Sequence, residues 1–107
     1  MSDLDFTICC TVTFFSKKRR TPPNLNNGKY CPHLVVKGSE QLLGVNFIDG
    51  EDVTFDKQIG ANALPENEAV DYSILQEGTE FLIMEGSAIV GEGIVKEIFQ
   101  HKPFGNK

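Results

Sequence analysis

Residues 6–15 (FTICCTVTFF) constrain the fold of this chain more than any other stretch. Apolar side chains at every second position alternate with Cys9 and with threonines; the apolar set is Phe6, Ile8, Cys10, Val12 and Phe14. Because successive side chains of a β-strand point to opposite faces, this period of two predicts a half-buried strand. An amphipathic helix would need a period near 3.6 residues, and no long stretch shows one cleanly. The sequence therefore predicts an all-β protein.

Short apolar runs separated by turn-forming residues continue along the chain. Further strands are predicted at residues 33–37, 42–48, 53–55, 59–64, 81–84 and 89–99. The Asp49-Gly50 pair predicts a tight turn, and Pro65 is expected to end a strand because proline has no N–H for a ladder. Closing such a sheet on itself would remove its exposed edges, so the predicted fold is a closed antiparallel barrel of about six strands.

Two segments interrupt this pattern. Residues 16–32 (SKKRRTPPNLNNGKYCP) contain the Pro22-Pro23 pair, three asparagines and a glycine, and they predict a long loop of the kind that is often functional or mobile. Gly91 and Gly93 lie at alternate positions of the last predicted strand. They predict a bend, or a close approach of another backbone, at a barrel corner.

The length of 107 residues suits one domain with one hydrophobic core, spanning residues 1–107. Its 40% hydrophobic and 23% charged residues are typical of globular proteins, and no apolar run approaches the ~20 residues of a membrane helix. The N-terminus (MSDLDFTICC) has acids where a secretory signal carries Lys or Arg, which predicts a cytoplasmic protein. Residues 100–107 are expected to form a frayed tail.

Three cysteines without regular spacing favour free thiols over a disulfide framework. Cys9 and Cys10 are neighbours on a predicted strand, so one thiol should enter the core and the other should face outward. A zinc site that joined one of them to Cys31 and His33 would lack the paired spacing of zinc motifs. No metal or other cofactor is therefore predicted.

The formal net charge of -5 is divided unevenly along the chain. Residues 1–38 hold six Lys or Arg against two Asp, whereas residues 39–107 hold four against thirteen acids. An acidic domain opposes binding that depends on Lys and Arg displacing counterions from phosphates. The one concentrated positive patch consists of Lys17, Lys18, Arg19 and Arg20, which would suit phosphate or an acidic partner. The alternative interpretation is a solvated turn tip that keeps the barrel soluble.

In residues 80–99 (EFLIMEGSAIVGEGIVKEIF), a phenylalanine, a Glu-Gly turn and a Val-Gly-x-Gly-x-Val strand follow one another. This order resembles the end of the third domain of bacterial elongation factor Tu, whose turn reads Arg-Glu-Gly-Gly. More weakly, VTFFSK and GKYCPHLVV resemble that domain's first strand with its Leu-Ser-Lys turn and the Gly-Tyr-Arg-Pro-Gln segment that opens its second. Anchors at both ends mean that the resemblance covers most of the chain.

The resemblance implies a closed antiparallel barrel like the C-terminal domains of translational GTPases. It implies no GTP hydrolysis, because the family's nucleotide site lies in another domain and this chain has no GxxxxGK[ST] phosphate loop. In the family this domain helps to hold aminoacyl-tRNA and meets other proteins. Glu85 and Gly86 match the Glu-Gly pair that approaches the tRNA backbone.

Other positions depart from the family's basic character. Met84 stands where the family has arginine, and Asp71 aligns with a second basic residue. Cys31 stands where the family's arginine precedes a proline, and His33 stands where its glutamine follows that proline. Fewer phosphate contacts are therefore expected than the family makes.

The remaining candidates have simple interpretations. Glu85 is expected to cap a turn or contact a partner, since the sequence shows no second titratable group for catalysis, and His33 is expected at the barrel rim. Gly86, like the two strand glycines, is expected to serve geometry. Two interpretations stay open for Tyr30 and Tyr72: a partner-binding surface, or a ring half-buried at the barrel end with its hydroxyl in water.

The predicted function is a non-catalytic protein-binding module. One specific version is an immunity or decoy protein that binds a toxin or factor engaging the translation machinery, because an acidic protein associates quickly with a basic partner. The alternative is a tRNA- or RNA-binding translation accessory using residues 17–20 with Glu85 and Gly86, which the acidic charge disfavours. An enzyme using Cys31 and His33 lacks an orienting third group. No membrane or nucleotide partner is predicted.

Overall fold

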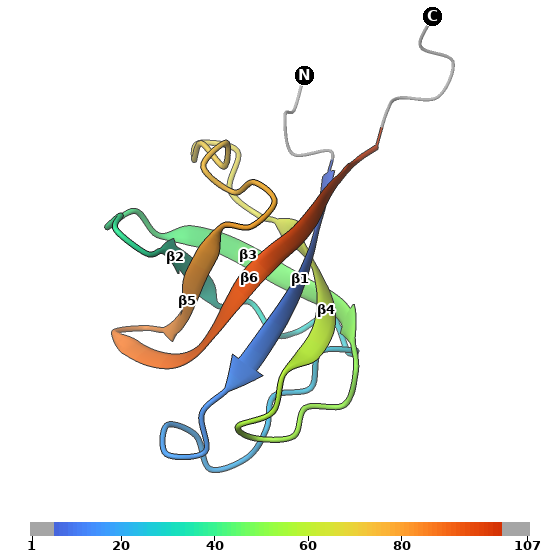
Figure 1. Cartoon of the computed structure of the whole chain (residues 1–107), viewed down its shortest axis with the longest axis vertical. Helices are drawn as coiled ribbons and strands as arrows, with labels where there is room; N and C mark the ends of the chain where they lie inside the picture. The colour runs from blue at the N-terminus through green and yellow to red at the C-terminus, as the bar shows by residue number, and fades with distance from the viewer. Residues whose placement is uncertain (1–5, 102–107) are drawn as a thin grey trace, which may run out of the picture.

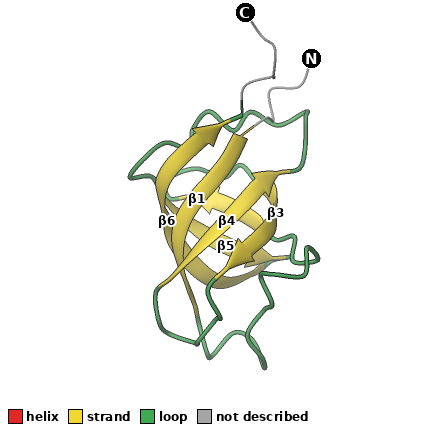
Figure 2. Cartoon of the chain, turned by 90° about the vertical axis from the view of Figure 1, so that its right-hand side faces the viewer, coloured by secondary structure: helices red, strands yellow, loops and turns green. Residues whose placement is uncertain are grey.

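The computed structural model describes residues 6–101, and within them six β-strands close into a barrel. The strands are β1 (Phe6–Phe14), β2 (His33–Val36), β3 (Leu43–Gly50), β4 (Ile59–Pro65), β5 (Glu80–Glu85) and β6 (Ala88–Gln100). They are hydrogen-bonded in the order β1-β4-β3-β2-β5-β6, every neighbouring pair is antiparallel, and β6 returns to β1 (Figures 1 and 2). The closed antiparallel barrel is therefore confirmed. This part of the chain contains no helix long and apolar enough to cross a membrane.

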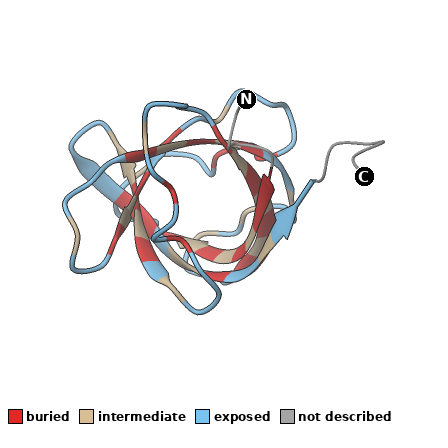
Figure 3. Cartoon of the chain, turned by 90° about the horizontal axis from the view of Figure 1, so that it is seen from above, coloured by how far each residue is buried: buried red, intermediate tan, exposed pale blue. Residues whose placement is uncertain are grey.

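On β1 to β5 alternate side chains fill the barrel interior, whereas the buried side chains of β6 are those of Val90 and Val95. Along β1 the five alternating apolar residues from Phe6 to Phe14 are all buried, and the largest fully buried side chains include Phe14, Phe47 and Phe81. Buried positions recur on the strands around the barrel (Figure 3). Cys10 is buried and Cys9 is only partly so, as the alternation predicted. On β1 to β5 apolar burial thus follows the period of two in the sequence.

Gly91 and Gly93 let β6 pass close to β1. A Cβ on Gly91 would lie 2.5 Å from the carbonyl oxygen of Thr13. On Gly93 it would lie 2.6 Å from that of Thr11 and 2.6 Å from Cζ of Phe81. The predicted close approach of another backbone is confirmed. The missing side chain of Gly93 also leaves room for the buried Phe81 ring beside the strand.

Two local predictions were wrong. Asp49 and Gly50 do not form a tight turn: they extend β3 and pair with Asn62 and Ala61, after a β-bulge that follows Phe47. Residues 53–55 are not a strand but part of the β3–β4 connection, and Val53 and Phe55 pack against the core from there. In both places packing around the barrel end outweighs the local turn or strand signal.

The predicted frayed tail is also partly wrong. Gln100 belongs to β6 and pairs with Phe6, and the His101 ring lies 2.6 Å from the Thr7 hydroxyl, measured from Nε2 to Oγ1. Cross-strand pairing with β1 thus continues farther than the loss of apolar alternation suggested. Residues 102–107 lie outside the described part of the chain.

The long β1–β2 connection, residues 15–32, closes one end of the barrel. Leu25 is only 1% exposed. Its Cδ1 atom would lie 2.8 Å from a Cβ added to Gly50, so the leucine side chain packs against this glycine. The Asn26 amide donates to the carbonyl of Gly50 at 3.0 Å and accepts from its N–H at 3.2 Å. Carbonyls of Tyr30 and Pro32 accept N–H groups of β3. The connection therefore continues the ladder beyond β2, and in the structure it is a packed segment.

The alternating strand directions sort the connections between two ends of the barrel (Figure 1). The lower end holds residues 15–32, 51–58 and 86–87, and the upper end holds residues 37–42 and 66–79. Lower-end connections carry six Lys or Arg against three carboxylates, while upper-end connections carry one lysine against five. The uneven charge of the sequence becomes a difference between the two ends.

Candidate functional site

Three of the predicted site residues meet at the lower end. Glu85 ends β5, Tyr30 comes from the end of the β1–β2 connection, and Arg19 comes from its beginning. The Tyr30 hydroxyl donates to Oε2 of Glu85 at 2.6 Å, and Nε of Arg19 lies 2.8 Å from the same oxygen. The Arg19 guanidinium carbon also lies 5.5 Å from the centre of the Tyr30 ring, within range of a cation–π contact. We call these three residues the clamp.

The clamp rests on the barrel core through Tyr30. Its ring stacks on Phe47 with centroids 5.8 Å apart and meets the edge of Phe14 at 5.9 Å. Burial, and then the hydrogen bond to Glu85, raise the pKa of Tyr30 far above its ordinary value, while Arg19 opposes the shift. The phenol therefore stays a neutral donor. Tyr30 is half-buried at the barrel end as one interpretation held, and its hydroxyl donates to a protein carboxylate.

The clamp holds separate segments of the chain together. Glu85 accepts from two donors on one oxygen, and the two ion-pair side chains are partly shielded from solvent, 23% exposed for Arg19 and 33% for Glu85. Charge-assisted hydrogen bonds of this kind are stronger than neutral ones. The clamp ties both ends of the β1–β2 connection to the β5–β6 hairpin.

Arg19 of the clamp belongs to the turn of residues 15–20, which we call the cationic turn. Other contacts also fix this turn. Phe15 donates its N–H to the carbonyl of Val90 at 2.9 Å, and Lys18 donates to Phe15 at 3.1 Å. The Ser16 N–H donates to the carboxylate of Asp56 at 3.2 Å, and hydrogen bonds from Ser16 lower the pKa of that carboxyl. Asp56, which has a φ of 64°, donates its own N–H to Phe14 at 2.7 Å. The turn is thus braced by β1, β6 and the β3–β4 connection.

The other members of the predicted patch face solvent. Lys17, Lys18 and Arg20 are exposed, and none of them takes part in an ion pair within residues 6–101. Gly86 lies beside them in the β5–β6 turn with a φ of 60°, a left-handed conformation that favours glycine. The geometric role expected for Gly86 is confirmed.

His33 and Cys31 do not join the clamp. His33 is exposed at the start of β2, opposite Met84 of β5. The exposed thiol of Cys31 donates to Oε2 of Glu66 at 3.6 Å, and desolvation and Glu66 raise the pKa of Cys31. A raised pKa disfavours the reactive thiolate. Within residues 6–101, no group of three His, Cys, Asp or Glu side chains is placed to hold a metal ion.

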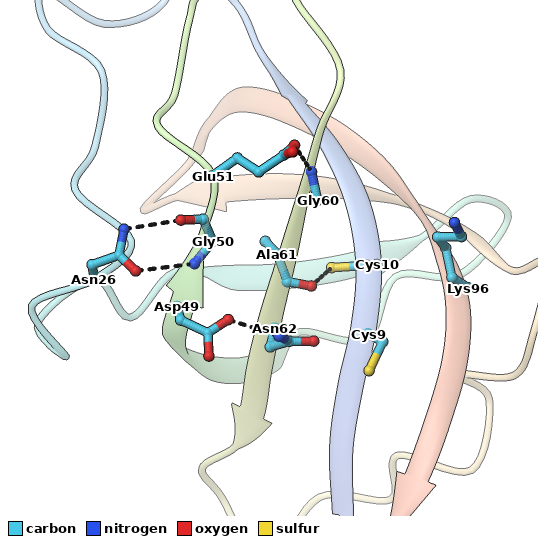
Figure 4. A pocket seen from close by; sticks show the side chains of 10 residues that line it. All are labelled: Cys9, Cys10, Asn26, Asp49, Gly50, Glu51, Gly60, Ala61, Asn62 and Lys96. Atoms are coloured by element: carbon cyan, nitrogen blue, oxygen red, sulfur yellow. Dashed lines mark hydrogen bonds between the residues drawn. The ribbon is translucent and has the colours of Figure 1, made fainter.

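A shallow hollow of about 530 Å³ lies on the outer face of the barrel (Figure 4). It is lined by Cys9, Cys10, Asn26, Asp49, Gly50, Glu51, Gly60, Ala61, Asn62 and Lys96. Its carboxylates already have partners: Asp49 accepts from the Asn62 amide at 2.7 Å and Glu51 from the N–H of Gly60 at 2.7 Å. The sequence offered no signal for this hollow, because its lining comes from distant segments.

Tyr72 organises the upper end, a role that sequence reasoning missed. It is 5% exposed, and its hydroxyl donates to the carbonyl of Gly44 at 2.5 Å. The same oxygen accepts the N–H groups of Glu66 at 3.2 Å and Asn67 at 3.1 Å. The ring meets Phe6 edge-on at 6.2 Å. The expectation of a hydroxyl in water is therefore wrong for Tyr72, which pins the β4–β5 connection to the barrel.

The pinned connection, residues 66–79, forms an acidic surface. It contains no Lys or Arg, and its carboxylates belong to Glu66, Glu68, Asp71 and Glu77. Asp71 accepts the N–H of Ser73 at 2.9 Å, and this contact lowers its pKa. Ile74 lies 40% exposed in the same connection. We call this segment the acidic loop.

Comparison with known proteins adds no family. No protein-family model matches the chain, and no curated protein matches its sequence. The closed barrel is established by the structure alone. The resemblance to the third domain of elongation factor Tu stays a prediction from the sequence motif.

Proposed function

We propose that this protein is a non-catalytic protein-binding module. The observation that carries the proposal is the acidic loop, which carries carboxylates and the exposed Ile74. The Tyr72 hydroxyl accepts two N–H groups of this loop and donates to the Gly44 carbonyl of β3. A surface that is ordered before binding loses less conformational entropy on association. An exposed apolar side chain in a connection whose charges are all negative also offers the apolar and polar components that interfaces combine.

The groups that could carry chemistry support the same proposal. The thiols of Cys10 and Cys31 have raised pKa values, the former about 12, because of burial and, for Cys31, also because of Glu66. Tyr30 is held neutral and Glu85 is occupied by two donors. Each of these four groups therefore has a structural partner or an unfavourable ionisation state.

The charge of the acidic loop points to a partner with a basic surface. This fits an immunity or decoy protein that occupies a basic toxin or a translation-related factor. Opposite charges on the two proteins would speed their association and make the rate fall with rising salt. The clamp, at the other end of the barrel, would keep its structural role in such a complex.

Two exposed carboxylates provide a matched test. Glu68 lies in the acidic loop and Asp52 at the lower end, and neither makes a hydrogen bond or ion pair within residues 6–101. Immobilised wild-type protein, Glu68→Lys and Asp52→Lys would be incubated with lysate of the native cell at physiological salt. We expect wild type and Asp52→Lys to retain the same partner and Glu68→Lys to lose most of it. Recovery of nothing above background, or equal recovery by all three, would contradict the proposal.

A second candidate function is RNA binding at the lower end, favoured by the exposed and unpaired Lys17, Lys18 and Arg20 beside Gly86. A filter-binding titration with tRNA at rising salt tests it, because each lost phosphate contact lowers the log-log salt slope by about 0.7 to 0.9. Lys17→Glu with Arg20→Glu should abolish the binding if it exists. No retention of tRNA even at low salt would exclude this candidate.

A further inference from the structure

A second surface lies at the lower end, on the opposite side of the barrel from the acidic loop. We call it the basic rim, and it consists of Lys17, Lys18 and Arg20 together with the exposed residues 86–89 of the β5–β6 hairpin. Two contacts show that its halves are adjacent: Phe15 N–H to the Val90 carbonyl at 2.9 Å, and Arg19 to Glu85 at 2.8 Å. The rim is therefore one continuous feature made from segments about seventy residues apart in the chain.

The rim has a rigid base. Arg19 points inward to Glu85 and Tyr30, and its Nη1 also donates to the Thr21 carbonyl at 2.7 Å. These contacts hold the backbone on both sides of Arg20. A turn that only kept the protein soluble would not need the contact between Arg19 and the partly buried Tyr30 ring. Three cations are thus displayed on a preformed support, which reduces the entropy lost when a ligand binds.

The charges of the rim are incompletely balanced. Glu85 is occupied by the clamp, and Asp56, which faces Lys17, accepts the N–H of Ser16. Lys18 and Arg20 have no carboxylate within ion-pair distance in the described part of the chain. The rim therefore presents uncompensated positive charge to a ligand.

An apolar side chain adjoins these cations. Ile89 is 37% exposed at the start of β6, next to Val90, to whose carbonyl the cationic turn is bonded. We infer that the basic rim binds an acidic peptide segment of a second protein, with carboxylates on Lys17, Lys18 and Arg20 and an apolar side chain on Ile89. The inference is independent of the proposed function, which concerns the acidic loop, and it makes the chain a two-ended adaptor.

A peptide fits the rim better than RNA does. RNA would extend its charge past the three cations to a region where Glu51 and Asp52 are exposed as well as Lys29 and Lys57. Single-stranded RNA also gains affinity by stacking bases on aromatic rings. The one large exposed aromatic side chain among residues 6–101 is Phe99, which lies near the end of β6 and away from the rim. A short acidic segment needs neither a long basic track nor an aromatic platform.

The test uses the full chain and three labelled probes: a peptide of alternating glutamate and leucine, the same peptide with serine for leucine, and oligouridylate. Binding is measured by fluorescence anisotropy at low salt and at about 0.15 M, where the screening length is about 8 Å. Lys18→Glu removes one rim charge, and Lys96→Glu makes the same change on the outer face of β6 (Figure 4). Ile89→Ser removes the apolar contact.

We expect the glutamate–leucine peptide to bind more tightly than the other two probes. Lys18→Glu should weaken it about fivefold, the size expected for one exposed ion pair, and Lys96→Glu should leave it unchanged. Ile89→Ser should abolish the preference for leucine over serine. Tighter binding of oligouridylate, no peptide binding at low salt, or equal effects of the two lysine variants would overturn the inference. None of these results bears on the proposed function at the acidic loop, which the Glu68→Lys pull-down tests separately.

Discussion

Replacing Tyr72 by phenylalanine removes one oxygen and keeps the buried ring. That oxygen donates to the Gly44 carbonyl and accepts two N–H groups. The N–H of Glu66 also bonds to the Gly44 carbonyl at 3.1 Å, so it keeps a partner, whereas Asn67 has no other acceptor among the bonds of the described chain. Two hydrogen bonds are therefore lost outright. At roughly 1 kcal/mol each, Tyr72→Phe should lower the free energy of unfolding by about 2 kcal/mol.

Urea unfolding measures this change. With a slope of about 2 kcal/mol per molar, the midpoint should fall by about 1 M while the slope stays constant. Amide hydrogen exchange gives a local check: the N–H of Asn67 should lose protection, and that of Glu66 should keep most of it. A stability change below about 0.5 kcal/mol, or unaltered exchange at Asn67, would refute the role given to the Tyr72 hydroxyl.

Three further outcomes are expected. Gly93→Ala should lower the free energy of unfolding by about 3 kcal/mol in thermal or urea unfolding, because the added Cβ would overlap a backbone carbonyl and a buried ring. In the control Gly60→Ala the nearest atom lies 3.8 Å from the added Cβ, so the cost should be less than about 1 kcal/mol. Equal costs for the two variants would contradict the packing described. The raised pKa of Tyr30 stabilises the folded state below pH 10.0, and this contribution should be lost as pH rises above that value, so alkaline unfolding curves of Tyr30→Phe should fall less steeply than those of wild type. In native protein an alkylating reagent should modify exposed Cys31 before buried Cys10, as peptide mass spectrometry would show; simultaneous modification would indicate that the barrel opens.

The barrel could be predicted because its strands carry local information. The alternation from Phe6 to Phe14 and the paired glycines of β6 each have a direct meaning in a half-buried strand. The Asp49-Gly50 pair misled because its conformation depends on distant groups. Gly50 leaves space for Leu25 and bonds to the Asn26 amide, and neither contact can be read from the residues around position 50.

The candidate sites were predictable as residues but not as arrangements. Arg19 stood out in a basic run and Glu85 in a turn motif, and Tyr30 was a plausible interface aromatic. Their meeting depends on the path of residues 15–32 across the barrel end, which no local pattern specifies. Tyr72 was harder still, because a buried tyrosine with three hydrogen bonds has the same sequence signature as one on the surface.

The opposite charges of the two barrel ends have a consequence before any contact forms. Within residues 6–101 the cationic turn and the acidic loop lie at opposite ends, so this part of the molecule has an electric dipole directed along the barrel. A charged protein approaching in solution exerts a torque on such a dipole and rotates the end of opposite sign toward itself. The charged loops thus favour one orientation of an approaching protein before contact. The length of the strands sets the separation of the two charged ends and so the size of the dipole.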